Sequence, residues 1–427
     1  MRINVVGLGY IGLPTAAMFA RSGADVLGVD QSEHIVNTIN NGDIHIEEPG
    51  LLDIIRDVVG EGRLKAALKP SEADVFIIAV PTPNAKDEHQ SCDLKCVISA
   101  VHSIIPYLRK GNVVIVESTI APRTTEDVIA PMIRQAGFEL GQDVFLAHCP
   151  ERVLPGQILN ELVNNNRVVG GMTAACADKA ADIYSMFVQG EIIKTEAKTA
   201  EMSKLMENTF RDVNIALANE LAKICCKLKI NVMDVIRMAN KHPRVNIHTP
   251  GPGVGGHCLA VDPYFIYAAA PETAQIIKLA RDINTSMPDF VVQNVEALLG
   301  YDKSARIAVF GVTYKPNVDD IRESPALKIV DKLSASGYQL RIHDPHVKSL
   351  DNVTFEEALK DADILLCLVG HHEFKLMKGS DIRKLMSKPV VFDVTGTLQQ
   401  EDLDIINYGN LYSYVPENQQ NKNRLEL

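Results

Sequence analysis

The opening of the chain carries the pattern that most constrains its fold: a strand, a glycine-rich turn, a helix, and a second strand that ends in an acid. The apolar strand 3–6 runs into Gly-Leu-Gly-Tyr-Ile-Gly at 7–12, and the helical stretch 13–22 precedes a strand at 25–29 and Asp30. Glycines in this order allow a tight turn and the close approach of a pyrophosphate to a helix N-terminus. The pattern therefore predicts a Rossmann-type dinucleotide site.

Asp30 indicates which dinucleotide this site takes. An acid at the end of the second strand accepts hydrogen bonds from a ribose 2′-hydroxyl. The following residues, 31–33, offer no cation for a 2′-phosphate. We therefore expect NAD rather than NADP. The expected contacts from the turn are Gly7, Gly9, Tyr10, Ile11 and Gly12.

Two threonines follow later strands of the same unit. Thr82 comes after the apolar run 74–80, and Thr119 comes after the run 112–117. Because the carboxyl ends of parallel strands form the ligand crevice of such a sheet, both hydroxyls are expected to face the cofactor. Helix capping is the alternative role for each.

Another strand, 144–147, leads to the segment 148–156. Within it, Glu151 is a candidate to act as a base or to orient water, and Arg152 is a candidate anion-binding residue. An ordinary surface ion pair is the alternative for both.

Residues 196–228 contain almost no helix breaker and predict one long helix. Lys204 and Asn208 lie one turn apart on it, so both side chains could donate hydrogen bonds to one developing oxyanion. The alternative is a solvated polar face. A second helical stretch is expected at 270–299.

The loop 251–263 places Cys258 just beyond several glycines, where a ligand can approach the main chain. That position suits a nucleophile, and His257 and Asp262 are nearby titrating groups. A small buried hydrophobe is the common alternative for a free cysteine.

The last third of the chain repeats the first. Segments 306–311, 339–344 and 361–366 match the opening strands, and the loop 311–316 has one glycine and a lysine instead of the full glycine motif. This loop fits a phosphate ligand other than a second NAD. We expect an α/β protein with two Rossmann-like, doubly wound parallel-sheet domains joined by a central helical domain that contains the long helix. The expected boundaries are 1–195, 196–300 and 301–427, with a polar tail, 418–427, that frays.

Composition excludes several classes of partner. A net charge of −11 argues against nucleic acid. No apolar run approaches the roughly 20 residues of a membrane helix, and the initial strand leaves no room for a signal peptide. Eight cysteines without a CxxC pair or zinc-like spacing are typical of a cytoplasmic protein with reduced thiols and no metal.

Six stretches together carry a resemblance to a known family: GLGYIGLP at 7–14, AVPTP at 79–83, ESTI at 117–120, the helix with Lys204 and Asn208, GGHCLAVDP at 255–263 and GVTYKPNVDDIRESP at 311–325. The chain resembles the UDP-glucose/GDP-mannose dehydrogenase family over essentially its whole length. HCPERVLPG at 148–156 and the sequence around Cys258 resemble the branch that acts on UDP-N-acetylhexosamines. Related enzymes often carry an arginine shortly after the last strand, which 394–399 lacks.

The resemblance implies that C6 of a sugar on UDP is oxidised from an alcohol to a carboxylate while two NAD are reduced in turn. Cys258 would form a thiohemiacetal and then a thioester. Lys204 and Asn208 would stabilise alkoxide-like oxygens, and Glu151 and Asp262 would orient or activate water.

The resemblance also implies the binding residues. Arg322 would reach the NAD. A homodimer or larger homo-oligomer would form through the long helix, with Arg244 acting on a partner subunit's site. The implied substrate contacts are Lys204, Asn208, Arg152, Val153, Arg211, His242, Arg244, Gly255, Tyr314 and Lys315.

Several readings compete for the substrate and the activity. UDP-N-acetyl-D-mannosamine is the expected substrate, for a surface polysaccharide or glycan precursor, and the glucosamine and galactosamine nucleotides are the alternatives. A β-hydroxyacid dehydrogenase would share the first two units but needs no nucleophilic cysteine. A non-catalytic protein that binds nucleotide sugars or NAD is the alternative from a different class.

Overall fold

A computed structural model describes residues 1–348, 350–398, 400 and 402–415. The tail predicted to fray lies outside the described residues. The chain separates into two compact units: unit 1 comprises residues 1–207 and 264–273, and unit 2 comprises 208–263 and the described part of the chain from 274 on. The three-domain division stays a prediction.

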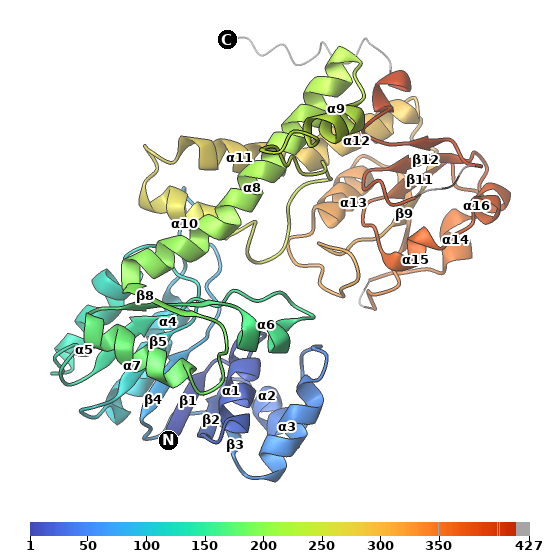
Figure 1. The fold of residues 1–427 in the computed structure, drawn as a ribbon. Helices are drawn as coiled ribbons and strands as arrows, with labels where there is room; N and C mark the ends of the chain where they lie inside the picture. The colour runs from blue at the N-terminus through green and yellow to red at the C-terminus, as the bar shows by residue number, and fades with distance from the viewer. Residues whose placement is uncertain (349, 399, 401, 416–427) are drawn as a thin grey trace. The chain divides into compact units, whose positions relative to one another are not determined.

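Unit 1 is built on an eight-stranded sheet with the order β3-β2-β1-β4-β5-β6-β7-β8 (Figure 1). Its first six strands have the strand order of dinucleotide-binding sheets, in which the order reverses between β1 and β4 and leaves a crevice for a ligand. The sheet is not parallel throughout, because β7 runs antiparallel to β6. The strands are β1 (Arg2–Val6), β2 (Asp25–Val29), β3 (Leu64–Ala67), β4 (Val75–Ile78), β5 (Val113–Val116), β6 (Phe145–His148), β7 (Arg167–Gly171) and β8 (Ile192–Glu196).

Both faces of this sheet are covered. Along β4, Val75 and Ile77 join one apolar core, while Phe76 and Ile78 join another. Side chains of a strand alternate between faces, so these uninterrupted apolar strands are explained by two buried faces. The helical segments of unit 1 are α1 (Gly12–Arg21), α2 (Glu33–Asn40), α3 (Leu51–Gly60), α4 (Lys95–Ile104), η1 (Ile105–Tyr107), η2 (Thr125–Ile129), α5 (Ala130–Gln135), α6 (Ile158–Asn164) and α7 (Ala174–Tyr184).

The long helix is α8 (Ala197–Leu228), which agrees with the predicted range (Figure 1). It is followed by α9 (Val232–Ala239), α10 (Asp262–Ala269), α11 (Gln275–Thr285) and α12 (Met287–Leu298). The helical stretch expected at 270–299 is present as two helices, α11 and α12. Ser286 separates α11 from α12, and Pro288, which lacks an N–H, fits only the first turn of a new helix.

Unit 2 contains a five-stranded parallel sheet with the order β10-β9-β11-β12-β13. Its order reverses between β9 and β11, so it too has a switch point where ligands bind in such folds. The predicted fold class is confirmed. The elements are β9 (Arg306–Phe310), α13 (Pro325–Ala335), β10 (Gln339–His343), α14 (Phe355–Leu359), β11 (Ile364–Cys367), α15 (His372–Lys375), α16 (Gly379–Leu385), β12 (Val390–Asp393), β13 (Ile405–Ile406) and η3 (Leu411–Ser413).

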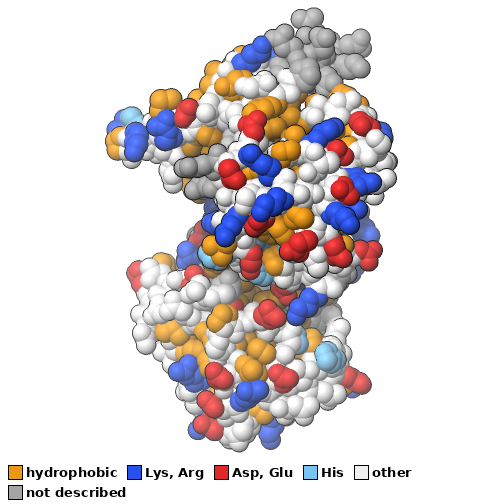
Figure 2. Space-filling view, turned by 90° about the vertical axis from the view of Figure 1, so that its right-hand side faces the viewer, with side chains coloured by type: hydrophobic (Ala, Val, Ile, Leu, Met, Phe, Trp, Pro, Cys, Tyr) orange, Lys and Arg blue, Asp and Glu red, His pale blue; other side chains and the backbone are white. Residues whose placement is uncertain are grey.

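The surface carries charges of both signs. On the face shown in Figure 2, lysine and arginine side chains are interspersed with aspartate and glutamate. Within the described part of the chain, no helix combines the length and the apolar character needed to cross a bilayer.

Candidate active site

The glycine turn after β1 is fixed by its own packing. Gly7 has φ +94°, and a Cβ there would lie 2.5 Å from the carbonyl oxygen of Ala79. A Cβ on Gly12 would lie 1.8 Å from the carbonyl oxygen of Gly7. A Cβ on Gly9 would meet nothing within 4 Å. Gly7 and Gly12 are thus required by the chain itself, whereas the space beside Gly9 is open to a ligand such as a pyrophosphate.

Asp30 is tied to this turn. Its Oδ2 accepts a hydrogen bond from the Leu8 N–H at 3.0 Å, and its Oδ1 accepts one from the Ser32 N–H at 3.0 Å. The carboxylate is half-buried. Each oxygen retains acceptor capacity, so the group is held in place and can still accept a ribose hydroxyl.

The other predicted cofactor residues of unit 1 lie at the same end of the sheet. Tyr10 and Ile11 form the turn that enters α1. The Thr82 hydroxyl donates a hydrogen bond to the carbonyl oxygen of Thr119 at 2.5 Å, which brings together the segments after β4 and β5. The strand ends, the open space at Gly9 and Asp30 fit a bound dinucleotide.

Glu151 follows β6 and is buried. Its Oε1 accepts a hydrogen bond from the Arg152 N–H at 2.7 Å, and its Oε2 lies 2.9 Å from Nη2 of Arg167. No hydrogen bond from a described residue reaches Oε2, because neither hydrogen on Nη2 points at it. Oε2 of Glu151 therefore accepts no hydrogen bond from the described residues and is buried beside the Arg167 guanidinium.

Arg152 and Val153 are differently engaged. Nε of Arg152 donates a hydrogen bond to Oε2 of Glu207 at 3.0 Å, and Nη2 lies 2.5 Å from Oε1. Arg152 thus forms an ion pair, but with Glu207 and not with Glu151. Val153 packs against the unit 1 core. Lys204 is half-buried on the unit 1 part of α8.

In unit 2, two predicted catalytic residues, Asn208 and Asp262, form a direct hydrogen bond. Nδ2 of Asn208 donates a hydrogen bond to Oδ2 of Asp262 at 2.6 Å, and both residues are buried. Cys258 is exposed, and its carbonyl oxygen accepts the N–H of Asp262 at 2.8 Å. One turn of chain therefore joins the thiol-bearing residue to the Asn208–Asp262 pair.

The glycines before Cys258 allow a close contact with the segment after β9. A Cβ on Gly255 would lie 2.4 Å from the carbonyl oxygen of Glu323, and one on Gly256 would lie 2.8 Å from the Tyr314 ring. The Lys315 ammonium lies 5.7 Å from the centroid of that ring. The predicted substrate residues Gly255, Tyr314 and Lys315 thus come together.

Arg322 forms a cluster with Asp320 and His257, the residue that precedes Cys258 in the sequence. Its guanidinium donates two hydrogen bonds to Asp320, at 2.9 and 2.7 Å, and His257 Nε2 lies 3.4 Å from Oδ2 of the same carboxylate. Burial and the Arg322 charge lower the pKa of His257, although Asp320 opposes them. His257 is therefore neutral near pH 7.

The remaining predicted substrate residues, Arg211, His242 and Arg244, are exposed in unit 2. Nδ1 of His242 accepts a hydrogen bond from the Arg244 N–H at 3.4 Å. Their roles stay predictions.

Comparison with known proteins identifies the family. Residues 1–188 match the NAD binding domain of the UDP-glucose/GDP-mannose dehydrogenase family, residues 198–286 its central domain, and residues 308–400 its UDP binding domain. The chain belongs to this family. It is an NAD-dependent dehydrogenase.

Three relatives are similar to this dehydrogenase over most of its length. The UDP-N-acetyl-mannosamine dehydrogenase of Staphylococcus aureus is 54% identical, with a TM-score of 0.92 over 97% of this chain and 100% of that one. The UDP-N-acetyl-D-mannosamine dehydrogenase of Methanocaldococcus jannaschii is 47% identical, covering 94% of this chain and 93% of the relative. That of Escherichia coli is also 47% identical, covering 90% and 96%.

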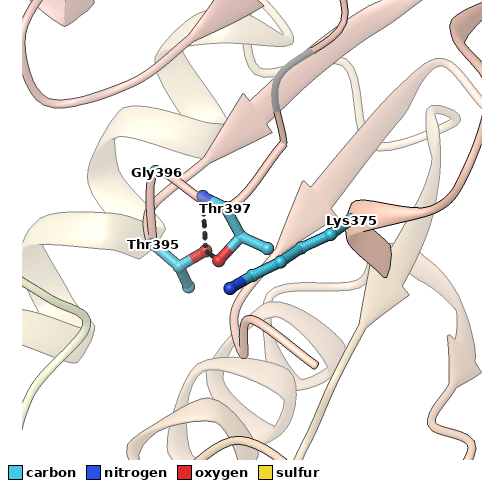
Figure 3. A pocket seen from close by; sticks show the side chains of 4 residues that line it. All are labelled: Lys375, Thr395, Gly396 and Thr397. Carbon is cyan, nitrogen blue, oxygen red and sulfur yellow. Dashed lines mark hydrogen bonds between the residues drawn. The ribbon is translucent and has the colours of Figure 1, made fainter. Parts of the chain in front are cut away.

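Two cavities lie away from the predicted catalytic residues of this dehydrogenase. One of about 560 Å³ is lined by Lys375, Thr395, Gly396 and Thr397, within the UDP binding domain. Figure 3 shows Lys375 pointing toward the threonine hydroxyls. Lys375 thus supplies a cation beside the segment that lacks the family's arginine. A second cavity, of about 630 Å³, includes Thr173, Lys194 and Lys198 in unit 1.

One cluster of possible metal ligands occurs in the described residues: His346, His371 and Glu373. Both ring nitrogens of His371 are already engaged, Nδ1 by the Asn317 N–H at 2.9 Å and Nε2 by Asp344 at 3.1 Å. Two ligands remain, fewer than the three or four protein ligands of zinc sites. The cluster does not support a metal site.

The sequence did not predict the contacts that Glu117, Arg167 and Asp320 make around the predicted site residues. The first two approach Glu151 only through pairing of β5, β6 and β7. No local spacing signals such contacts. Asp320 could have been found from its place in the motif at 311–325.

Proposed function

We propose that this dehydrogenase oxidises C6 of UDP-N-acetyl-D-mannosamine to the carboxylate through covalent intermediates on Cys258. The overall change is one primary alcohol, two NAD⁺ and one water converted to one carboxylate, two NADH and three protons. The observation that carries the proposal is the buried Asn208–Asp262 pair, joined by one turn to an exposed cysteine.

NAD supplies the hydride acceptor for both oxidations. Asp30 and the turn at 7–12 would hold its ribose and pyrophosphate, and the strand-end hydroxyls of Thr82 and Thr119 would orient it. Arg322 is proposed as a further contact to NAD.

Lys204 and Asn208 would act on the reacting oxygen. They lie four residues apart on α8, so both side chains are on one face. An ammonium and an amide N–H on that face would stabilise negative charge as the alcohol loses its proton and then as a thiol adds to the aldehyde. Lys204 would relay the first proton, releasing one of its own toward solvent as it takes up that of the alcohol.

Cys258 would convert the aldehyde into a species that can be oxidised again. Its thiolate forms a C–S bond with the aldehyde carbon, and the oxygen takes up a proton. Loss of a hydride and of that proton leaves a thioester. Water then attacks the carbonyl carbon and the C–S bond breaks, which returns the thiol and releases the acid.

Glu151 and Asp262 would serve the hydrolytic step. Glu151 would take a proton from the attacking water. Its Oε2 accepts no hydrogen bond from the described residues and is buried beside Arg167. Asp262 is held by Asn208 and would orient water near the thioester.

The predicted substrate residues would contact the UDP-sugar. Tyr314, Lys315 and Gly255 would contact it in unit 2, together with Arg211, His242 and Arg244. Arg152 and Val153 would contact it from unit 1, which requires Arg152 to exchange Glu207 for substrate. The names of relatives that are 47% to 54% identical favour the mannosamine sugar. The glucosamine and galactosamine nucleotides remain the alternatives, and the product would serve surface polysaccharide synthesis in the cytoplasm.

A homodimer is part of the proposal. Four large apolar side chains are exposed at helical spacing on the unit 2 part of α8: Phe210, Leu217, Ile224 and Leu228. Such a stripe suits a second copy of the same helix. Arg244 would then act on the site of the other copy.

The first test is the yield of NADH per UDP-sugar under limiting substrate, with the mannosamine, glucosamine, galactosamine and glucose nucleotides compared. Two NADH per mannosamine nucleotide, with little product from the others, is the expected result. One NADH would mean that the reaction stops at the aldehyde, and no NADH with any sugar would favour a binding protein.

Cys258→Ser tests the covalent route. We expect acid formation to fall by at least about 10³-fold, because a serine hydroxyl is a far weaker nucleophile. Cys92→Ser is the matched control, since Cys92 is another partly accessible thiol of the chain. Acid formation at the wild-type rate in Cys258→Ser would refute the thioester.

A further inference from the structure

Unit 1 contains a buried charged cluster that includes Glu151. Its central group is Arg167 of β7, which is 5% exposed. Glu117, at the end of β5, and Glu151, after β6, both approach its guanidinium and are 2% and 8% exposed. One buried cation therefore serves two buried carboxylates.

A single nitrogen of Arg167 is shared between the two acids. Nη2 lies 2.6 Å from Oε1 of Glu117 and 2.9 Å from Oε2 of Glu151. Only the contact with Glu117 has hydrogen-bond geometry. The hydrogens of Nη2 are thus directed to Glu117, and Glu151 receives the charge without the hydrogen bond.

The rest of the cluster fixes Glu117 and Arg167. Nε of Arg167 donates to Sγ of Cys149 at 3.1 Å, and its guanidinium carbon lies 4.0 Å above the Tyr184 ring. The Tyr184 hydroxyl donates to Oε1 of Glu117 at 2.6 Å, and the Thr15 hydroxyl of α1 donates to Oε2 at 3.2 Å. Neither side chain can turn away without losing these contacts.

We propose that Arg167 is a positioning residue for Glu151, and that Glu117, by gaining or losing a proton, sets how much of the Arg167 charge acts on Glu151. This inference rests on the proposed role of Glu151 in hydrolysis of the thioester.

The other titratable groups of the cluster do not change charge near neutral pH. Burial lowers the pKa of His148 to about 3 and raises that of Cys149 to about 11. Burial also raises the pKa of Tyr184 well above its usual value. His148, Cys149 and Tyr184 are therefore uncharged around pH 7.

Burial raises the pKa of Glu117 to about 7, with Arg167 lowering it and Glu151 raising it. Below that pH, Glu117 is protonated, and the charge of Arg167 acts on Glu151 alone. Above it, two carboxylates share one cation, so Arg167 offsets less of the charge of Glu151. Activation of water by Glu151 should therefore increase as the pH rises through 7.

The decisive variant is Glu117→Gln, which keeps the shape and an acceptor for Tyr184 but cannot carry charge. We expect the rise of acid release through neutral pH to disappear and the rate above pH 7 to fall about tenfold, with KM little changed. The Cys258 thioester should accumulate, as measured by mass spectrometry of the quenched enzyme. An unchanged pH profile without thioester accumulation would overturn the proposal.

Arg167→Lys tests positioning with a cation that cannot form the same fork. We expect kcat to fall far more than KM, again with thioester accumulation. Glu201→Gln is the matched control, because Glu201 is another buried acid of unit 1, bonded to Thr125. Its pH profile should be that of wild type. Wild-type acid release from Arg167→Lys would refute the positioning role.

Infrared difference spectroscopy separates this proposal from the proposed function, because it needs no turnover. A protonated carboxyl band should disappear as the pH of the wild-type protein rises through 7, and Glu117→Gln should lack it. A wild-type band that titrates only near 4.5, the ordinary value for glutamate, would overturn the proposed role of Glu117 even if two NADH form per sugar.

Discussion

The sheets of the two units begin with the same arrangement of strand, glycine and acid, but the acid has a different role in each. In unit 1, β1 leads to Gly7, and the N–H of Leu8 donates to Asp30 at the end of β2 at 3.0 Å. In unit 2, β9 leads to Gly311, and the N–H of Val312 donates to Asp344 after β10 at 2.7 Å. Both glycines have positive φ, +94° and +80°. The repeated sequence pattern is therefore a repeated structure.

The difference lies in what surrounds the acid. Asp30 is half-buried and accepts two main-chain N–H groups. Asp344 is fully buried and also accepts a hydrogen bond from Nε2 of His371 at 3.1 Å. Since Nδ1 of His371 accepts the Asn317 N–H, its proton is assigned to Nε2. Asp30 keeps capacity for a ligand, whereas Asp344 is committed to the fold.

The helix after the glycine differs as well. In unit 1, α1 begins at Gly12, directly beyond the turn. In unit 2, α13 begins only at Pro325, after a side-chain cap from Ser324. Only unit 1 therefore presents helix N–H groups beside the glycine turn, and a second NAD site is not expected in unit 2.

The largest expected effect comes from Gly12→Ala. The new Cβ would fall 1.8 Å from the Gly7 carbonyl oxygen, so the turn must shift. NAD affinity should fall at least about 100-fold, and unit 1 should lose a few kcal/mol of stability, on the order of 2–4. Calorimetry and urea unfolding measure the two effects. Gly60→Ala is the control, because its Cβ would meet nothing within 4 Å.

Asp344→Ala should mainly affect stability. It leaves the Val312 N–H and the His371 ring buried without their acceptor, which costs about 3 kcal/mol in the free energy of unfolding. NAD affinity should be unchanged, since this acid serves no ligand. The exposed Asp331→Ala is the control. A loss of NAD affinity in Asp344→Ala would mean that the two units share the cofactor role.

The pH dependence of stability should distinguish the buried acids of the two units. The pKa of Glu117 is raised by burial from 4.5 to about 7, so the folded state holds the proton more tightly and stability decreases as the pH rises from 4.5 to about 7. The change should be about 3 kcal/mol and should vanish in Glu117→Gln.

Asp344 should show the opposite sign. Burial alone would raise its pKa, but bonds from His371 and Val312 hold it below 3.8, so its contribution is present above that pH and lost in acid. Urea unfolding across pH measures both dependences. A flat profile in the wild type between 4.5 and 7 would contradict the difference.

Asp30→Ala should have the smallest effect. Loss of the ribose acceptor should raise the Kd for NAD roughly tenfold, about 1.4 kcal/mol, while UDP-sugar affinity stays the same. Asp25→Ala, an exposed acid on the same strand, is the control. Unchanged NAD affinity in Asp30→Ala would contradict the contrast with Asp344, because neither acid would then serve a ligand.

The sequence predicted the parts of this comparison that depend on local chemistry. Strands such as β2 and β9 and the helix α8 follow from apolar runs and missing breakers, and Asp30 follows from its distance to the glycine turn. The start of α10 was missed, although Asp262 and Pro263 are typical first residues of a helix.

Long-range contacts could not be predicted in this way. Arg167 contacts Glu117 because β7 joins the sheet antiparallel to β6. His371, which follows β11, contacts Asp344, which follows β10, because these two strands flank β9. Sequence spacing carries no signal for either contact. Whether a buried acid is shared, enclosed or open to a ligand follows only from such pairings.

The most direct test is the number of NAD molecules that bind to the full chain, measured by calorimetry with and without saturating UDP. Our account predicts one NAD per chain and no competition by UDP, because only unit 1 keeps an open acid beside a glycine turn and a helix N-terminus. Two NAD per chain, or displacement of NAD by UDP, would contradict it.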